Sequence, residues 1–291
     1  MNVKISVLTP TYNRAKLLQR LYESLTIQKY SNFEWIVVDD GSIDETQQVV
    51  EELKKQAAFP IKYVKQKNHG KPSAHNAGVG LAESDLTVIC DDDDYLTPCA
   101  LQIIADSWTR NQSSEIGGMI AYKGESESTT LRGKEFHVKV QTTHLDEIFS
   151  EGIFDTTQIY RTELLKKNLF PLTEGEKFVP EIWLWKKLDR KYTLFVLPEI
   201  LEVCEYLDTG LTKNGSQNLW NNPTGYAYYF FQEYELSNGW KKVKNYGVYT
   251  GLLKFSKKIQ IEKAPLWVSV LSWPITLAVI GKARLKSKKM S

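Results

Sequence analysis

Four consecutive aspartates, Asp91 to Asp94, directly follow an apolar run over residues 86–90. A strand that ends in clustered carboxylates brings like charges together, and this costs free energy unless a cation balances them. A solvated acidic turn is the simpler alternative and stays open here. A helix–loop–helix calcium site is excluded by spacing, because counting from Asp91 places Leu96 where that loop needs glycine and Gln102 where it needs glutamate. The sequence therefore favours a hard-metal site at the carboxyl end of a strand.

Two further polar clusters follow predicted strands. Residues 9–14 follow a predicted strand over 3–8, and Asp39-Asp40-Gly41-Ser42 follows one over 33–38. A capped turn before the next helix, with Ser42 or Asp44 as the cap, explains the glycine and the polar residues after it. It explains the two aspartates less well. A carboxylate there is suited to accept the imide N–H of a uracil ring or a ribose hydroxyl.

Glycine-rich phosphate loops are absent from the sequence. The pattern G-x-G-x-x-G does not follow the first predicted strand, and G-x-x-x-x-G-K-[ST] occurs nowhere in the chain. This excludes nucleotide binding in the manner of a dinucleotide dehydrogenase or a P-loop ATPase. The phosphates of a nucleotide ligand would need another counter-charge, and a divalent ion on the aspartates would supply it.

Strands and helices alternate through the first hundred residues. Helical spacing is found over 15–28, 45–56 and 73–82, and further strands are predicted over 61–64 and 86–90. Such alternation predicts an α/β fold with a doubly wound, mostly parallel sheet flanked by helices. Ligands bind beyond the carboxyl ends of the strands in these sheets, so we expect the three polar clusters on one edge.

The pattern loosens after residue 97. We predict strands over 119–122, 136–140 and 193–197, helices over 181–188 and 226–240, and a polar loop over 125–130. Four histidines show no metal-ligand spacing and are expected in loops or on the surface.

Charge and cysteine content limit the partners and the compartment. Residues 241–291 contain 12 Lys/Arg and one acid, Glu262, whereas the other 240 residues contain 25 bases and 34 acids. Only the tail is basic, so broad nucleic-acid binding by the body is not expected. Cys90, Cys99 and Cys204 lack metal-ligand spacing and predict buried thiols in a reducing compartment. A strand begins almost at the first residue and leaves no room for a signal peptide, so we expect a cytoplasmic body.

Four segments, in this order, resemble the inverting family 2 glycosyltransferases with the GT-A fold. They are residues 6–14 (SVLTPTYNR), 37–46 (VVDDGSIDET), 68–78 (with NHG and HNAG) and 91–96 (DDDDYL). The resemblance covers roughly the first hundred residues, and its motifs are specific only in combination. It implies a Rossmann-like GT-A fold and a nucleotide-sugar donor, most simply a UDP-sugar, in an enzyme of the bacterial surface-polysaccharide type.

The resemblance also implies roles for individual residues around the donor. Pro10, Thr11 and Asn13 would wall the nucleotide. Asp40, with Asp39 as second choice, would face the nucleobase.

The third segment implies two further donor contacts. Lys71 lies where the family often has a basic residue near the nucleotide, and Asn76 follows in the same segment. The usual arginine before Asn76 is here His75, which departs from the family pattern.

Asp91, Asp92 and Asp93 fill the D-x-D region of the family. We expect Asp93 to contact the metal directly and Asp91 to contact a ribose or, through water, the metal, with Asp92 in the donor site. Mg²⁺ or Mn²⁺ suits such an oxygen-rich site, with the diphosphate completing the coordination shell.

Inversion at a sugar carbon needs a base within hydrogen-bond reach of the acceptor hydroxyl. The family commonly places Glu-Asp at a helix start before an apolar stretch with tryptophan, and residues 180–183 (PEIW) resemble this, with Ile for Asp. We therefore expect Glu181 to be the base, with Glu176 as second choice. The alternative is that Glu181 is simply an acid favoured by the dipole at a first helical turn.

Residues 264–281 form an 18-residue segment without a charge. A spanning helix needs about 20 apolar residues, and Pro274 is expected to interrupt this one. Basic residues on both flanks argue against crossing, and Trp267 and Trp273 suit the headgroup region. We expect a segment lying in the inner leaflet. A helix packed on the catalytic body and a true span are the alternatives.

These observations predict a metal-dependent, inverting glycosyltransferase. It would transfer a sugar to a hydroxyl of a lipid-linked glycan, in surface-polysaccharide synthesis at the cytoplasmic face of the membrane, with no nucleic-acid partner. Residues 1–100 would bind the donor, 101–210 the acceptor, 211–263 would form a helical extension and 264–291 the membrane-associating tail. A sugar nucleotidyltransferase, or a membrane-recruited nucleotide-sugar-binding module without turnover, are the alternatives.

Overall fold

The computed structural model describes residues 2–134, 142–153, 155–204, 215–257 and 263–290, without the side chains of 215, 216, 284 and 286–290. The predicted strand over 136–140 lies outside the described residues. The chain forms two compact units. The first comprises Met1–Leu169 and Leu184–Leu207, and the second comprises Phe170–Trp183 and Asp208–Ser291.

The first unit begins with the predicted parallel half of a sheet. Its strands are β1 (Ile5–Thr11), β2 (Phe33–Asp39), β3 (Ile61–Lys65) and β4 (Leu86–Ile89), in the order β3-β2-β1-β4. The connecting helices are α1 (Ala15–Thr26), α2 (Thr46–Gln56) and α3 (Lys71–Leu81). β1 is longer than predicted, because its pairing with β2 continues to Thr11 and Asp39. Pro10 and Thr11 therefore belong to the strand and not to the loop after it.

The other half of the sheet makes it mixed. β9 (Thr156–Arg161) is antiparallel to β4 and to β6 (Ile116–Ser126), β10 (Thr193–Cys204) is parallel to β6, and β5 (Asp94–Leu96) is antiparallel to β10. The expected loop over 125–130 instead contains the end of β6 and β7 (Thr129–Thr130). β8 (Thr142–Thr143) pairs with β10. The predicted α/β class is confirmed.

The remaining elements of the first unit are short helices around this sheet. They are α4 (Ala100–Asn111), the 3-10 turn η1 (Leu131–Gly133), α5 (Leu145–Ser150) and α6 (Thr162–Lys167). The helix α7 (Ile182–Asp189) begins in the second unit and continues in the first.

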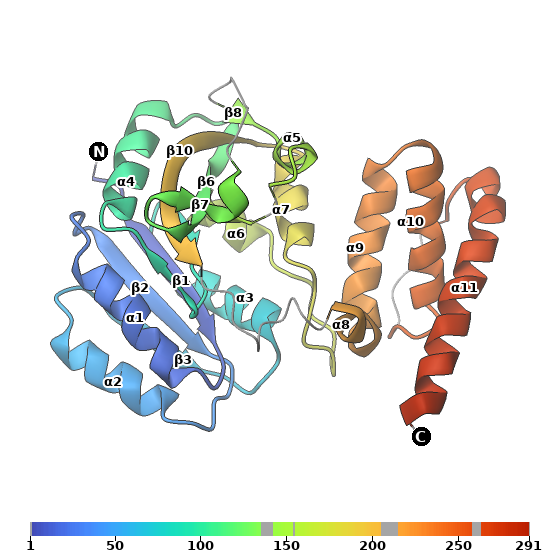
Figure 1. Ribbon diagram of the computed structural model, residues 1–291, viewed down its shortest axis with the longest axis horizontal. Coiled ribbons are helices and arrows are strands. Elements are labelled where there is room, and N and C mark those ends of the chain that lie inside the picture. Colours follow the sequence, from blue (N-terminus) through green and yellow to red (C-terminus); the bar gives the residue numbers. More distant parts are fainter. Residues whose placement is uncertain (1, 135–141, 154, 205–214, 258–262, 291) are drawn as a thin grey trace. The chain divides into compact units, whose positions relative to one another are not determined.

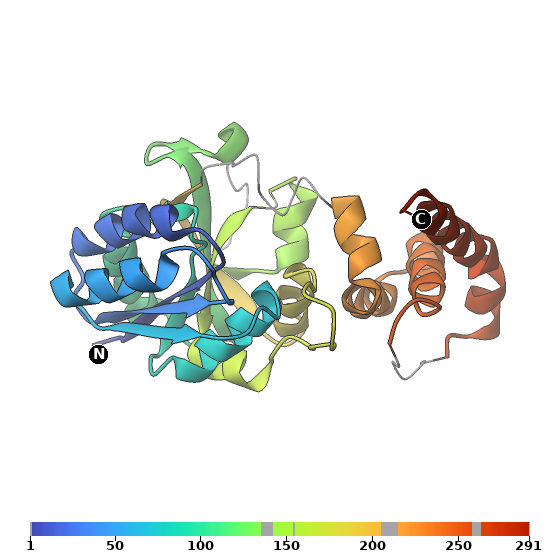
Figure 2. The same cartoon turned by 90° about the horizontal axis from the view of Figure 1, so that it is seen from below.

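Helices cover both faces of the sheet (Figures 1 and 2). α1, α2 and α4 share one core with alternate strand residues such as Val7, Val37 and Val88, which are fully buried. On the other face, α3 lies so close to β1 that a Cβ at Gly78 would lie 2.1 Å from Leu8 Cδ1. Only glycine permits this approach, and it places the start of α3 at the carboxyl edge of the strands.

The acidic loop, residues 90–93, has both ends anchored in this sheet. It leaves β4, which pairs with β1, and enters β5, which pairs with β10. Just beyond β5, the Thr97 N–H donates to the carbonyl of Leu201 at 3.0 Å. The position of the four aspartates is therefore determined by strands from both halves of the sheet.

The second unit contains four helices among its described residues: α8 (Gly215–Asn221), α9 (Pro223–Leu236), α10 (Gly239–Leu252) and α11 (Leu266–Met290). The single helix predicted over 226–240 is wrong. The chain breaks at Ser237, whose hydroxyl accepts a hydrogen bond from Asn245 at 3.1 Å, and Gly239 adopts a φ of 54°, which glycine accommodates most easily.

Contrary to expectation, α11 runs without interruption through Pro274. A proline inside a helix removes one hydrogen bond, and packing of the adjacent turns can preserve the helix. Here Ser272 is buried and the Thr276 hydroxyl hydrogen-bonds the Thr250 hydroxyl of α10 at 2.7 Å. A Cβ at Gly247 of α10 would lie 2.7 Å from Ile275 Cβ, so the two helices are in close contact.

Candidate functional site

The loops after β1 and β2 are joined to each other by polar contacts. Asn13 has a φ of 53°, and its side-chain oxygen accepts the N–H of Ile43 at 2.8 Å. The carboxylate of Asp44 accepts the N–H of Ala15, at the start of α1, and that of Thr46, at the start of α2, both at 3.1 Å. Asp44 thus acts at two helix starts, where the sequence predicted one cap. The first two polar clusters lie side by side at the carboxyl edge, as expected.

Asp39 and Asp40 are both buried at the end of β2. Asp39 accepts the N–H of Ser42 and the hydroxyl of Tyr63, each at 2.7 Å. The phenol therefore donates to a carboxylate, and burial together with this contact raises the pKa of Tyr63 above its usual range. Asp39 shapes the turn that leads into α2.

Asp40 holds the segment that precedes α3. Its two carboxylate oxygens accept Gln66 Nε2 at 2.7 Å, the His69 N–H at 2.9 Å and the Gly70 N–H at 2.7 Å. Gly70 has a φ of 90°, a conformation that favours glycine. The predicted contact of Asp40 with a nucleobase stays a prediction.

Asp92 connects the acidic loop to β1. Its carboxylate accepts the Thr11 hydroxyl at 2.6 Å and Arg14 Nη1 at 2.8 Å. Burial raises the pKa of Asp92 to about 6, although the nearby charge of Arg14 opposes this shift. Of the four aspartates, Asp92 is the one most directed toward the protein, and its predicted donor contact stays a prediction.

The other three aspartates face one another. Carboxylate oxygens of Asp91, Asp93 and Asp94 all lie within 4.8 Å of one another. At an effective dielectric constant near 20, two such charges repel by roughly 3–4 kcal/mol at this separation. Burial and the charges of Asp91 and Asp94 accordingly raise the pKa of Asp93. The predicted D-x-D pair, Asp91 and Asp93, is brought together here, and Asp94 joins it.

Each of these three carboxylates has its own cation. Lys71 pairs with Asp91 at 2.7 Å, Arg14 with Asp93 at 2.9 Å and Lys123 with Asp94 at 2.7 Å. Although removal from water favours the neutral form of Asp91, Lys71 and Lys123 lower its pKa. These cations compensate the repulsion and keep the carboxylates assembled.

The donor set fits a hard divalent ion. Three carboxylates at one point offer oxygen ligands alone, which Mg²⁺ and Mn²⁺ prefer, whereas sulfur and imidazole are the ligands of softer metals. Asp91 and Asp93 remain partly exposed, so an ion and its waters have access to them. Asp93, Asp91 and Asp94 would hold the ion.

α3 positions Lys71 and Asn76, and it also contains a buried histidine. His75 lies edge-on to the ring of Trp185 with centroids 6.0 Å apart. Burial lowers the pKa of His75 to about 3, so the ring is neutral. The expectation of a loop or surface position is wrong for this residue, because position 75 lies on the buried face of α3 with Pro72 and Gly78, each three residues away.

The two candidate bases belong to the second unit. Glu176 is engaged at the start of α9, where its carboxylate accepts the N–H groups of Thr224 at 3.0 Å and Gly225 at 2.9 Å. Glu181 is partly exposed and directly precedes α7, as predicted for the first turn of that helix. Glu176 therefore has a structural role, and the assignment of Glu181 as the base stays a prediction.

Sequence reasoning gave no individual role to four charged residues of this site. Arg14 lies within a motif that carries the family resemblance, and Asp94 belongs to the predicted acidic cluster without being named as a metal or donor contact. Lys123 and Glu202 lie on β6 and β10, and their ion pair of 2.9 Å joins residues 79 positions apart. A charged residue within an otherwise apolar strand was the available signal.

The family model "Glycosyl transferase family 2" matches residues 6–169, more than half of the chain. The chain belongs to glycosyl transferase family 2. The matched region contains the three polar clusters, Lys71 and Lys123.

Relatives of this family 2 chain include two proteins named as glycosyltransferases. An uncharacterized glycosyltransferase of Nostoc sp. is 36% identical over 118 residues, which are 40% of this chain and 36% of the relative. A GalNAc(5)-diNAcBac-PP-undecaprenol beta-1,3-glucosyltransferase of Campylobacter jejuni is 25% identical over 225 residues, 77% of this chain and 72% of the relative. The match to the first relative thus spans little more than a third of its length.

Solved structures show the same fold. A crystal structure of residues 1–349 of Staphylococcus aureus TarS superposes with a TM-score of 0.60 at 18% identity, covering 99% of this chain and 92% of the other. A second structure of that protein contains UDP-GlcNAc and superposes at 0.59. At this identity the similarity establishes the GT-A architecture of this family 2 chain.

Proposed function

We propose that this chain is a metal-dependent, inverting glycosyltransferase that uses a UDP-sugar. The observation that supports it most strongly is the group of Asp91, Asp93 and Asp94, each paired with a separate cation at the carboxyl edge of the sheet. Such an edge is where ligands bind in α/β sheets. Structural relatives crystallised with UDP-GlcNAc or with Mn²⁺ and UDP support this choice of donor and metal.

The metal, Mn²⁺ or Mg²⁺, would supply positive charge for the departing diphosphate. Arg14 and Lys71 are partly exposed and adjoin the same edge. A divalent ion held by Asp91 and Asp93 would compensate their charge and would allow these two side chains to bind phosphate oxygens. The proposed donor site is completed by Pro10, Thr11, Asn13, Asp39, Asp40, Asn76 and Asp92.

Glu181 would take the proton of the acceptor hydroxyl, which then attacks the anomeric carbon. The leaving diphosphate departs from the opposite face of the sugar ring, so the configuration is inverted. A glycan hydroxyl, carried on a lipid, is the proposed acceptor. The undecaprenol-linked substrate named for the Campylobacter relative supports a role in surface-polysaccharide synthesis.

The test uses the full chain with a panel of UDP-sugars, Mn²⁺ and a lipid extract as acceptor source, and measures UDP release. Asp93→Ala is expected to lose metal-dependent UDP binding. Glu181→Gln is expected to keep UDP binding and to lose roughly 10²- to 10⁴-fold in transfer rate. Glu174→Gln is the matched control, since Glu174 is exposed in the same segment.

The outcomes separate the alternatives. Full activity in Glu181→Gln removes that residue as the base. UDP-sugar binding without release, with every acceptor tried, identifies a binding module. Release of pyrophosphate from UTP and a sugar phosphate identifies a nucleotidyltransferase.

We also propose that α11 associates with the cytoplasmic membrane surface. Among the described residues, α11 contains the one segment, Leu266–Ala283, that is long and apolar enough to cross a membrane. The exposed surface of this segment is largely apolar, which is unusual for a helix of a soluble protein. Small polar residues Ser272 and Thr276 face α10, whereas Leu266, Val270 and Trp273 are 81%, 61% and 62% exposed.

Small residues at helix contacts and large apolar residues outside are typical of helices in lipid. Basic residues flank the segment on both sides, which favours an anionic surface and a segment that returns to the same side. The residues of α11 with large exposed apolar side chains are Leu266, Trp267, Val270, Leu271, Trp273, Leu277 and Leu285.

Flotation with vesicles tests this association. Vesicles that contain anionic phosphatidylglycerol should retain the chain, and neutral phosphatidylcholine vesicles should retain less of it. Trp273→Ser should reduce binding, whereas Trp240→Ser, at an equally exposed tryptophan on α10, should not. Equal effects of the two substitutions would contradict a specific role of α11.

A further inference from the structure

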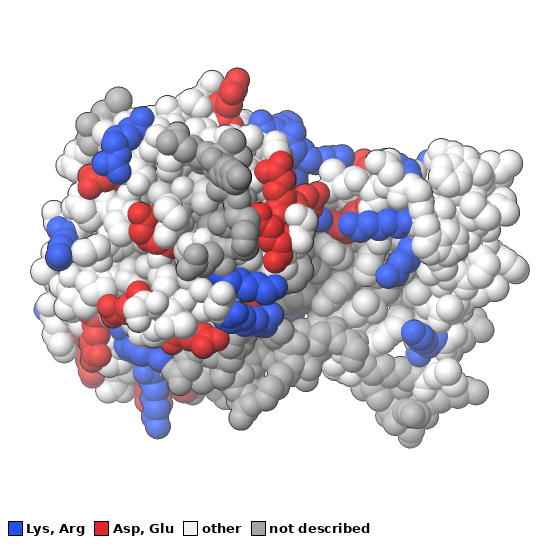
Figure 3. Space-filling model, turned by 45° about the horizontal axis from the view of Figure 1, so that its top comes forward, with Lys and Arg blue, Asp and Glu red and all other residues white. Residues whose placement is uncertain are grey.

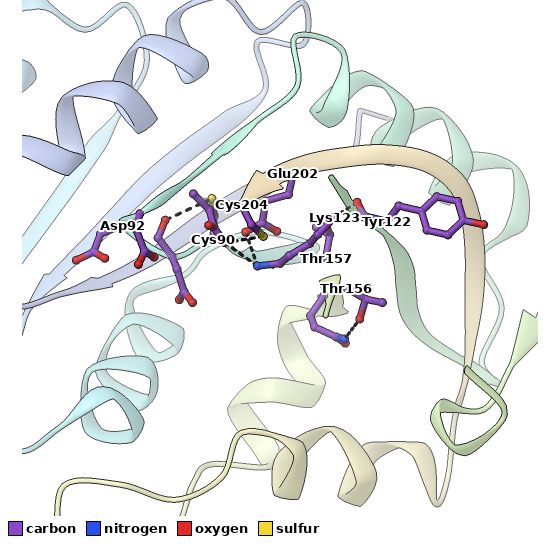
Figure 4. Close-up of polar contacts among 12 residues, drawn as sticks. Cys90, Asp92, Tyr122, Lys123, Thr156, Thr157, Glu202 and Cys204 are labelled. Atoms are coloured by element: carbon purple, nitrogen blue, oxygen red, sulfur yellow. Dashed lines mark hydrogen bonds and ion pairs between the residues drawn. The ribbon is translucent and has the colours of Figure 1, made fainter. Parts of the chain in front are cut away.

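A buried lysine, Lys123, adjoins the acidic loop from within the sheet. Its ammonium lies 2.7 Å from Asp94 Oδ2 and 2.9 Å from Glu202 Oε1. Lys123 and Glu202 are register neighbours on the parallel strands β6 and β10, and Leu96 of β5 lies on the other side of Glu202. Figure 4 shows the lysine side chain running from β6 toward Glu202 and Cys204.

The charges of this cluster depend on one another. Glu202 is completely buried and Asp94 nearly so, and buried charges persist only when they are paired. The ammonium of Lys123 lies within ion-pair distance of both carboxylates and joins them in one cluster.

Lys123 differs from the other two cations of the site. Arg14 and Lys71 are 24% and 22% exposed and adjoin loops at the edge of the sheet. Lys123 lies in the middle of a sheet strand, is 15% exposed, and is held by Glu202 from behind. It is the cation least able to move when a ligand arrives.

We propose that Lys123, held by Glu202, is a positioning residue that presents Asp94 to the divalent ion beside Asp91 and Asp93. The lysine holds Asp94 through Oδ2, and a carboxylate oxygen of Asp94 lies within 4.8 Å of carboxylate oxygens of Asp91 and Asp93. Hydrogen-bond partners of metal-ligating carboxylates fix their orientation, and losing such a partner typically costs 10–100-fold in metal affinity. This role rests on the metal dependence proposed above.

The test measures Mn²⁺ binding alone, without nucleotide or turnover, by the loss of the free Mn²⁺ electron paramagnetic resonance signal. The full-length Lys123→Met variant is expected to bind Mn²⁺ at least about 10-fold more weakly than the wild type. Long-range electrostatics alone predicts tighter Mn²⁺ binding in this variant, because removing a positive charge near the site favours a bound cation. A merely structural lysine predicts no change in the affinity of the folded protein.

A second ion pair of the same sheet, with one buried partner, provides the control. Lys62 Nζ lies 3.0 Å from Glu34 Oε2; Glu34 is 1% exposed near the amino-terminal end of β2, the edge opposite the acidic loop, and the Lys62 side chain is 32% exposed. Lys62→Met is expected to lower stability and to leave Mn²⁺ affinity unchanged. If Lys123→Met does not fold, the double variant Lys123→Met/Glu202→Gln is titrated in its place, because it also removes the charge of the second buried carboxylate.

Each outcome has one meaning. Weaker Mn²⁺ binding in the Lys123 variants, with wild-type binding in Lys62→Met, supports the positioning role. Unchanged or tighter Mn²⁺ binding in the Lys123 variants overturns it and leaves the proposed glycosyltransferase intact. A wild-type chain that binds no Mn²⁺ overturns the metal dependence itself.

Discussion

Asp40 is predicted to stabilise the first unit through the segment before α3. Its carboxylate accepts three hydrogen bonds, from Gln66, His69 and Gly70, at 2.7–2.9 Å, and its side chain is buried. In Asp40→Asn one oxygen becomes an NH₂ group, which cannot accept the N–H it then faces. At least one buried donor is left without an acceptor, and the other bonds lose their charge.

The magnitude follows from these contacts. An unsatisfied buried donor costs about 1–3 kcal/mol, and hydrogen bonds to a charged group are worth roughly 1 kcal/mol more than neutral ones. We expect Asp40→Asn to lower the free energy of unfolding by about 2–4 kcal/mol. For a unit of this size, that corresponds to a fall of roughly 5–12 °C in Tm.

Thermal unfolding followed by circular dichroism gives the stability, and calorimetric titration of UDP gives the affinity. UDP binding should also weaken, because Lys71 directly follows the segment that Asp40 holds. The control is Asp106→Asn, an exposed position on α4, which should change stability by less than about 0.5 kcal/mol. A wild-type Tm in Asp40→Asn combined with lost UDP affinity would refute this account and indicate direct contact with the nucleobase.

Three further predictions concern stability. Because the pKa of His75 is about 3 in the folded chain, on acidification the unfolded chain takes up this proton first, and the free energy of unfolding falls below about pH 6.5. His75→Gln should abolish about 2 kcal/mol of the loss between pH 7 and pH 5, measured by urea titrations at the two pH values. Gly247→Ala should destabilise the contact of α10 with α11 by about 1–3 kcal/mol, detected by limited proteolysis, whereas Gly281→Ala, where a Cβ meets nothing within 4 Å, should not. Glu176→Gln should weaken the start of α9, lower the free energy of unfolding by about 0.5–2 kcal/mol, and leave the transfer rate of the folded protein unchanged. A transfer rate as low as that of Glu181→Gln would reverse the choice of base.

The parallel half of the sheet was predictable because its signals are local. Apolar runs, helical spacing and polar clusters at strand ends identify β1 to β4, α1 to α3 and the edge where ligands bind. The antiparallel strand β9 and the pairing of β5 with β10 join residues more than 60 positions apart. No local pattern specifies such partners.

Within the site, residue types alone determined that carboxylates gather after β4 and that their charge needs compensation. Which aspartate faces which partner was decided by tertiary structure. Asp92 turns toward Thr11 and Arg14, whereas Asp94 joins Asp91 and Asp93 because β5 pairs with β10. The sequence by itself thus determined the family, the fold class and the chemistry of the edge. The cations that make four adjacent carboxylates tolerable come from β6, α3 and the first loop, and only folding brings such distant charges within 3 Å.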